Sequence, residues 1–221
     1  MVSPPTEGTD RHGTREGTAL TDLIDISRMR HTVRSYAERP VEHDKLMRVL
    51  EAGRWAPTAV NAQPQRILVL DTPENLSKVR EFCTFGWQRR YVDLAEQSDT
   101  PEHDRIVLYY GAPVVLVICY DREACWTHPQ TGATSGPTDA TIVATHMMLQ
   151  AASMGLGSAW ISYFDHAKAR ELLAIPSTWE IASMLYLGYP AGDEKPNHKL
   201  SASRKPLDET CFFNETPKEE S

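Results

Sequence analysis

Residues 139–162 read DATIVATHMMLQAASMGLGSAWIS, and they contain the clearest helix of the chain followed by a strand. Apolar residues recur at 140, 143, 144, 147, 148 and 151, which is the spacing of one helical face. Several of them are alanines, so we expect another helix to pack closely against this face. The glycines at 155 and 157 end the helix. Residues 158–162 then predict a strand.

Further apolar runs on both sides of this stretch complete the pattern of a layered fold. Runs at 66–70, 113–119 and 181–187 predict buried strands, and segments at 21–29, 43–54, 73–82 and 165–173 predict helices. Their order predicts an α/β or α+β fold in which helices flank a mixed sheet. No repeat or linker interrupts residues 21–221, so we expect a single domain with a C-terminal extension. Residues 1–20, rich in Pro, Gly, Thr and charge, are expected to be a disordered N-terminal extension.

The composition argues against several classes of protein. With 221 residues, 41% hydrophobic and 24% charged, the chain resembles ordinary globular proteins. Its formal net charge of -7 disfavours binding to nucleic acid, which requires a basic face. No apolar run reaches the roughly 18 residues of a membrane-spanning helix, so we expect no membrane partner. Four scattered cysteines predict a reduced protein of the cytoplasm, and Cys125 with His128 lacks the neighbours of a zinc site.

Two polar segments stand out, about one helix apart. The sequence RHTVRSY at residues 30–36, here called the basic segment, sets two arginines and a histidine around a hydroxyl residue, a set that suits a phosphate. The sequence APTAVNAQP at residues 56–64, here called the amide turn, is a rigid polar turn suited to the polar edge of a planar ring. No Gly-x-Gly-x-x-Gly follows a predicted strand, so no separate dinucleotide-binding domain is predicted.

Four stretches occur together in a specific order: RHTVR at 30–34, PTAVNAQP at 57–64, GLGSAWI at 155–161, and LGYP at 187–190 followed by RKPL at 204–207. In this combination the chain resembles the nitroreductase family of flavin-dependent oxidoreductases, from about residue 23 to residue 214. The resemblance implies an α+β fold, a nitroreductase-like mixed sheet flanked by helices. It also implies an obligate homodimer with an intertwined interface and one FMN in each of two interface pockets.

The resemblance assigns cofactor-binding roles to particular residues. Those expected at the phosphate and ribityl chain are Arg30, Thr32 and Arg34 with His31 beside them, and Arg204 and Lys205 from the C-terminal segment. Those expected along the flavin ring are Pro57, Thr58, Ala59 and Asn61 from the other subunit, with Gln63 supporting the turn, and Trp160, Ile161 and Ser162. No catalytic side chain and no metal are expected, because the chemistry would take place at N5 of FMN.

The implied activity is transfer of hydride from NADH or NADPH to a small organic acceptor, such as a nitroaromatic, a quinone or an activated alkene. Both substrates would use one flavin face in turn, in a ping-pong mechanism. Two alternatives stay open: a reductive dehalogenase or flavin-fragmenting enzyme of the same superfamily, and a non-catalytic protein that binds or stores FMN. Residues 87–105 are a candidate substrate lid, or else an ordinary exposed helix.

Three places depart from the family pattern. Thr58-Ala59 stands where the family often has two serines, and Ala202 stands where some members have a lysine. Ser162-Tyr163 stands where some members carry Glu-Gly after the strand. We expect these departures to affect the choice of substrate more than the binding of flavin.

Overall fold

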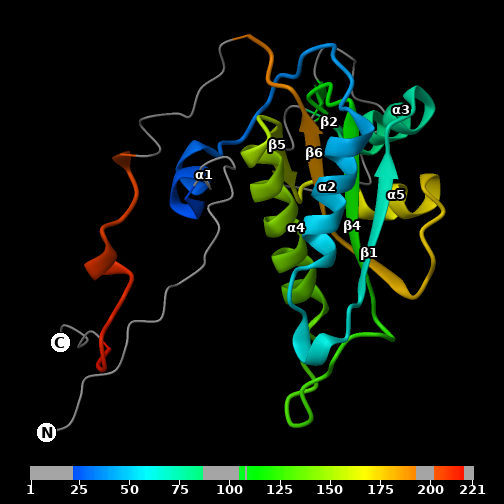
Figure 1. Ribbon diagram of the computed structural model, residues 1–221. Coiled ribbons are helices and arrows are strands. Elements are labelled where there is room, and N and C mark those ends of the chain that lie inside the picture. The colour runs from blue at the N-terminus through cyan, green and yellow to red at the C-terminus, as the bar shows by residue number, and fades with distance from the viewer. Residues whose placement is uncertain (1–21, 87–104, 108, 193–201, 217–221) are drawn as a thin grey trace, which may run out of the picture.

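A four-stranded antiparallel sheet forms the centre of the structure (Figure 1). The computed structural model describes residues 22–86, 105–107, 109–192 and 202–216. The strand order is β1 (Gln65–Leu70), β4 (Val114–Asp121), β6 (Trp179–Gly188) and β5 (Gly157–Ile161), and each neighbouring pair is antiparallel. A second, two-stranded antiparallel sheet pairs β2 (Thr84–Gly86) with β3 (Arg105–Val107).

Helices cover both faces of the central sheet. The α-helices are α1 (Leu23–Met29), α2 (His43–Arg54), α3 (Pro73–Phe82), α4 (Gly136–Ser153) and α5 (His166–Leu172), and two short 3-10 helices are η1 (Ala59–Asn61) and η5 (Leu207–Glu209). Figure 1 shows α2 and α4 side by side along the sheet, which is the close helix pairing that the small residues of α4 predict. At this contact a Cβ atom on Gly53 would overlap the side chain of Met147, so a larger residue there would require Met147 to move.

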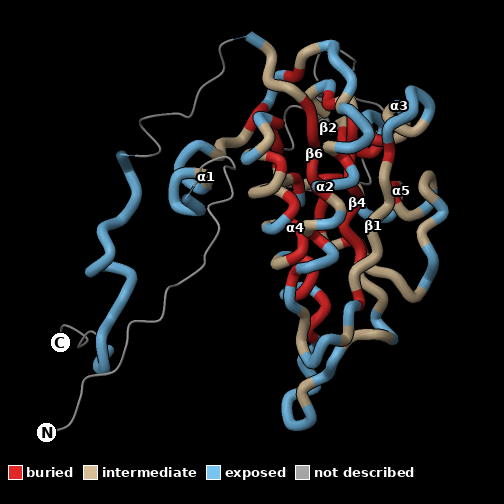
Figure 2. Tube along the Cα trace, viewed as in Figure 1, coloured by how far each residue is buried: buried red, intermediate tan, exposed pale blue. Residues whose placement is uncertain are grey.

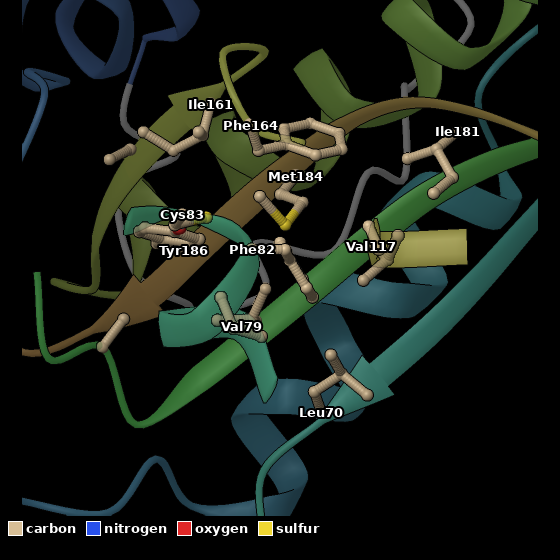
Figure 3. Close-up of a cluster of buried hydrophobic side chains, with 14 of the residues drawn as sticks. Leu70, Val79, Phe82, Cys83, Val117, Ile161, Phe164, Ile181, Met184 and Tyr186 are labelled. Atoms are coloured by element: carbon tan, nitrogen blue, oxygen red, sulfur yellow. The ribbon is translucent and has the colours of Figure 1, made fainter. Parts of the chain in front are cut away.

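The alternation of residues along β4 divides the core into two clusters. Val115, Val117 and Cys119 point to the cluster under α3 and α5, which Figure 3 shows around Phe82 and Tyr186. The intervening residues of β4 belong to the cluster under α2 and α4. Because helices cover both faces of β4, its side chains are buried on both sides, and this explains why the strand is a continuous apolar run.

Most predicted elements are confirmed, and two expectations need correction. The predicted mixed sheet is wrong for the described strands, which are antiparallel; in the described residues the parallel pairing is an isolated bridge between Thr32 and Ser158. An apolar strand pattern does not encode strand direction, and the connections here are long enough for either direction. The predicted helix or lid at 87–105 reaches Arg105, which lies in β3, and its other residues lie outside the described part, as do residues 1–20.

The cysteines have the environments expected of thiols. Cys119 is fully buried and free, as predicted, and Cys83 is fully buried with its Sγ 3.3 Å from the hydroxyl oxygen of Tyr186. Burial raises the pKa of both the Cys83 and the Cys119 thiol to about 12.

None of the helices in the described ranges combines the length and the apolar character needed to cross a membrane.

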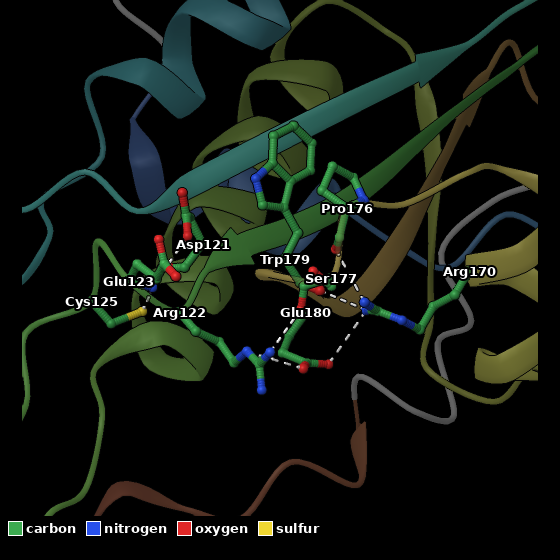
Figure 4. A network of polar contacts seen from close by, with 9 residues as sticks. All are labelled: Asp121, Arg122, Glu123, Cys125, Arg170, Pro176, Ser177, Trp179 and Glu180. Carbon is green, nitrogen blue, oxygen red and sulfur yellow. Dashed lines mark hydrogen bonds and ion pairs between the residues drawn. The ribbon is translucent and has the colours of Figure 1, made fainter.

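A polar network holds the chain that enters β6, as Figure 4 shows. The Arg170 guanidinium donates to the carbonyl oxygens of Trp179, at 2.6 Å, and Pro176, at 3.1 Å, and lies 3.6 Å from the Glu180 carboxylate. Arg122 contacts the same carboxylate at 3.4 Å and donates to the Ser177 carbonyl oxygen at 2.7 Å. The loop between α5 and β6 is therefore fixed by two arginines.

Replacing Arg170 with alanine should lower the free energy of unfolding by about 1–2 kcal/mol, because two carbonyls lose a charged donor. The ion pair adds little to this value, since Glu180 is partly exposed to solvent. Urea unfolding measures the loss. Arg122→Ala is the matched control: Arg122 donates to one carbonyl and is more exposed, so its loss should be smaller. Equal losses in the two variants would contradict this account.

Candidate functional site

The basic segment runs against the edge strand of the sheet. Helix α1 ends at Met29, and Arg30 caps it, since its backbone N–H donates to the Ile26 carbonyl oxygen at 2.9 Å. Beyond it, Thr32 forms the bridge with Ser158 of β5, and the Val33 N–H donates to the Ser158 carbonyl oxygen at 3.0 Å. Val33 is fully buried, which anchors the segment and leaves the alternate side chains facing away from the core.

Two guanidinium groups from distant parts of the sequence approach each other at this edge. The pKa of Arg30 lies below its usual value, first because burial disfavours the charge and second because Arg204 repels it. Within the described ranges, Arg30, Arg34 and Arg204 make no ion pair. Converging cations without a counter-ion form a favourable place for an anion.

The His31 side chain points to the same conclusion. Its Nδ1 atom lies 3.1 Å from the Met29 carbonyl oxygen, which fixes the ring. Its Nε2 atom is buried and has no hydrogen-bond partner. A buried polar atom without a partner is costly. Since the Met29 carbonyl can only accept, Nδ1 carries a proton, and Nε2 donates to an anion oxygen when the ring is doubly protonated. The residues at this edge therefore fit a phosphate group.

The other residues of the basic segment, the C-terminal segment and β5 that are predicted to bind FMN differ in burial and in their contacts. Arg34 and Lys205 are exposed, and the Lys205 ammonium lies 4.0 Å from the Glu209 carboxylate. Trp160 lies half-buried on β5 and donates from Nε1 to the Ser162 hydroxyl at 2.9 Å. The Ile161 side chain is buried in the core (Figure 3), so a contact between Ile161 and a cofactor would have to come from its backbone.

The amide turn has an unusual backbone conformation. Val60, Asn61 and Gln63 have positive φ angles of 48°, 58° and 50°, a region that a β-branched residue such as valine rarely adopts. Thr58 closes the turn, since its side-chain oxygen accepts from the Gln63 N–H at 3.0 Å. The Gln63 side-chain amide lies 3.5 Å from the Asn61 carbonyl oxygen, and the supporting role of Gln63 stays a prediction. Asn61 and Pro57 are exposed.

The basic segment and the amide turn lie at opposite ends of the sheet within one protomer (Figure 1). Thr32 bridges Ser158, which pairs with Leu187 near the end of β6. Gln65, which directly follows the amide turn, lies across β4 from Glu180, near the start of β6. From residue 180 to residue 187 a strand extends about 23 Å at roughly 3.3 Å per residue. This separation exceeds the distance from the phosphate to the ring edge within one FMN.

Large apolar side chains are exposed on the segments around the basic edge. Helix α1 buries none of its residues, and Leu23 and Ile24 on it are 61% and 51% exposed. In the C-terminal segment 202–216, Leu207 and Phe213 are 77% and 89% exposed. Figure 2 shows both segments exposed along most of their length, to one side of the helix-covered sheet. Exposed apolar surface of this extent is typical of a surface that another chain covers.

Comparison with known proteins identifies the family. The sequence profile of the nitroreductase family matches residues 27–189. The chain belongs to this family. This nitroreductase-family chain is similar to a nitroreductase family protein from Clostridium difficile 630, with 29% identity, a TM-score of 0.74, and coverage of 89% of this chain and 100% of the other. It is also similar to a provisionally assigned nitroreductase from Desulfovibrio desulfuricans in complex with FMN, with 25% identity, a TM-score of 0.63, and coverage of 90% and 100%.

Its relatives among named proteins include more than one activity. A protein of Archaeoglobus fulgidus, provisionally named NADH dehydrogenase/NAD(P)H nitroreductase, is 29% identical over 180 residues, covering 80% of this chain and 89% of the relative. The iodotyrosine deiodinase of Thermotoga neapolitana is 24% identical over 181 residues, covering 80% and 92%. The expected NAD(P)H-dependent oxidoreductase is confirmed at the level of the family, and the deiodinase keeps the dehalogenase alternative open.

Two residues at the site have roles that the sequence alone did not indicate. Ser158 supplies the carbonyl that anchors the basic segment, and Asp139 accepts at Oδ1 from the Ala59 N–H at 3.0 Å. Asp139 is four residues before Val143, in register with the buried face of α4, and is itself only 2% exposed. A carboxylate in register with an apolar helical face is the signal that would have drawn attention to it.

Proposed function

We propose that this protein is an FMN-dependent oxidoreductase that transfers hydride from NADH or NADPH to a small organic acceptor. The observation that carries the proposal is that Arg204 lies close enough to Arg30 to repel its charge, next to the basic segment residue His31, whose Nε2 has no partner. FMN, when bound, would supply the redox chemistry, accepting and donating hydride at N5. Nitroaromatics, quinones and activated alkenes are the acceptor classes that we propose.

In this proposal the chain's own residues bind and orient the cofactor. Arg30, Arg34 and Arg204 hold the phosphate, with Thr32 as a short neutral donor and Lys205 at the rim. Asn61 and the backbone groups of residues 57–59 hold the polar edge of the ring. Trp160, on the edge strand β5, and Ser162, which follows the end of β5, would lie beside the ring. No side chain is assigned a proton-transfer step.

We also propose that the working unit is an intertwined homodimer. The separation of the basic segment from the amide turn supports it, because two-fold symmetry would bring the basic segment of one protomer to the amide turn of its partner. The exposed apolar residues of α1 and of the C-terminal segment support it as well, since a partner subunit would cover them. The expected cytoplasmic location stays a prediction. The expectation that residues 21–221 form a single domain also stays a prediction.

The visible absorption spectrum of the purified protein tests the proposal. Protein saturated with FMN should be yellow, and it should bleach when NADH or NADPH is added without oxygen. The donor that bleaches it faster is the preferred one. A protein that takes up no FMN would refute the proposal, and bound FMN that resists both donors would favour the non-catalytic alternative, a protein that stores FMN.

Initial-rate kinetics test the use of one pocket by both substrates in turn. With a nicotinamide donor and a quinone acceptor both varied, a ping-pong mechanism gives parallel double-reciprocal lines. Intersecting lines would show that donor and acceptor are bound together, and would refute the mechanism.

The similarity to iodotyrosine deiodinase favours one second candidate, a reductive dehalogenase. Residues 89, 90, 91 and 96, which belong to the candidate lid that would grip an amino-acid substrate, lie outside the described residues. Release of iodide from 3-iodotyrosine by the reduced protein, measured with an iodide electrode, would favour this candidate. Turnover of a quinone without halide release would favour the first.

A further inference from the structure

A buried carboxylate ties the amide turn to the long helix α4. Asp139, in the first turn of α4, is 2% exposed, and its Oδ1 accepts from the Ala59 backbone N–H at 3.0 Å. Its other oxygen, Oδ2, is buried without a hydrogen-bond partner. A carboxylate is costly to bury, and the first turn of a helix is the place where the helix dipole offsets part of that cost. The hydrogen bond to Ala59 therefore stabilises a buried carboxylate, which a hydrogen bond at the surface does not.

The turn that donates this hydrogen bond is strained, and the other hydrogen bonds of residues 58–62 in the described structure stay within the amide turn. The Asn61 N–H donates to the Thr58 carbonyl oxygen at 3.0 Å, and the Ala62 N–H donates to the Ala59 carbonyl oxygen at 2.9 Å. Val60 has a φ of 48°, a conformation that costs free energy and persists only where the surrounding structure enforces it. Among the hydrogen bonds of the described residues, the one with Asp139 joins residues 58–62 to another element of the structure.

We propose that Asp139 is a positioning residue, which holds the amide turn in the conformation that presents Asn61 and its neighbouring backbone groups to the flavin ring. This role rests on the proposed FMN site. Asp139 does not touch the cofactor in this proposal; it acts through the Ala59 N–H. The energy that fixes the turn is present before FMN arrives, so the turn is preorganised and less ordering accompanies binding.

Two variants remove the same hydrogen bond from its two sides. Asp139→Ala removes the acceptor. Ala59→Pro removes the donor, and the backbone angles permit proline: Thr58, with φ and ψ of -130° and 156°, has the extended conformation required before proline, and Ala59 is the first residue of η1. The proline Cδ would replace the amide hydrogen that faces Asp139, so this variant also pushes the turn and the carboxylate apart. Asp139→Asn is the conservative variant, because its side-chain oxygen can still accept from Ala59.

The expected results are a change in FMN affinity and in the spectrum of bound FMN. Asp139→Ala and Ala59→Pro should each weaken FMN binding about tenfold and alter the visible circular dichroism of the bound flavin. The double variant should bind FMN no more weakly than the poorer single variant, because both changes act through one bond. Asp139→Asn should keep the affinity and the spectrum of the unmodified protein. Ser135→Ala, a change of another buried group at the same helix end, should do the same.

Hydrogen exchange of the Ala59 amide, measured on the full chain without FMN, provides a readout independent of the cofactor. The amide should exchange faster in Asp139→Ala and stay protected in Asp139→Asn and Ser135→Ala. If the unmodified protein binds FMN but Asp139→Ala matches it in affinity, spectrum and exchange, the positioning role is overturned and the proposed function stands. If Asp139→Ala does not fold, Ala59→Pro decides by FMN affinity and flavin spectrum alone, because proline has no amide hydrogen to exchange. If the unmodified protein binds no FMN, both proposals are overturned.

Discussion

Replacing Arg30 with alanine should weaken FMN binding by about 1.5–3 kcal/mol, the range of a hydrogen bond to a charged group, or about 10- to 150-fold in Kd. The reason is local: Arg30 is half-buried beside Arg204, and its lowered pKa means that the protein alone does not stabilise its charge. A phosphate would supply the missing counter-charge. Titration of FMN, followed by quenching of its fluorescence, measures the effect.

The same reasoning predicts that Arg30→Ala costs the FMN-free protein no stability, because the folded state disfavours the Arg30 charge. Thermal unfolding without FMN should therefore occur at the same temperature as in the unmodified protein, or higher. Arg28→Ala is the matched control, since Arg28 is on the same short helix and pairs with Asp25 at the exposed surface. A loss of FMN affinity in the control equal to that in Arg30→Ala would remove Arg30 from the phosphate site.

The sequence predicted the larger elements of the fold because their patterns are strong and local. Helix α2 begins at His43 and ends at Arg54 as predicted, since Leu46, Val49 and Leu50 form one apolar face. The Asp165 side chain caps α5 as predicted, accepting from the Lys168 N–H at 3.0 Å. The short strands β2 and β3 were missed, because three residues are too few for an alternating pattern.

The sequence names the residues of the candidate site, and it does not predict how they are arranged. The basic segment and the amide turn could be named from composition and family resemblance, but no local pattern places them at opposite ends of a sheet. The left-handed conformation of Val60 contradicts the preference of valine, so tertiary contacts decide it. One such contact joins Asp139 to Ala59, 80 residues apart in sequence, beyond any periodicity argument. Residue types indicate the chemistry of a site, whereas its assembly depends on contacts between residues far apart in the sequence.

At an FMN concentration too low to fill the defective sites, a mixed dimer of two defective chains should recover activity if each site combines the basic segment of one protomer with the amide turn of its partner. One chain carries Arg30→Ala and the other Asn61→Ala. The second change removes the side-chain amide and places alanine at a φ of 58°, which asparagine tolerates better. In the mixed dimer both defects fall in one site and the other site is intact. Purified mixed dimer should therefore show about half the activity of the unmodified dimer, by two-fold symmetry.

The matched control pairs Arg30→Ala in one chain with Arg204→Ala in the other. These two arginines approach each other within one protomer, so each site of that mixed dimer keeps one defect and no activity should return. Different affinity tags on the two chains allow both mixed dimers to be purified, and NADH oxidation with a quinone acceptor measures each. Without recovery in the first pair, the two segments would have to serve one site inside a single protomer, which the distance along β6 opposes. Recovery in both pairs would instead mean that Arg30 and Arg204 of one protomer serve the two different phosphate sites of the dimer.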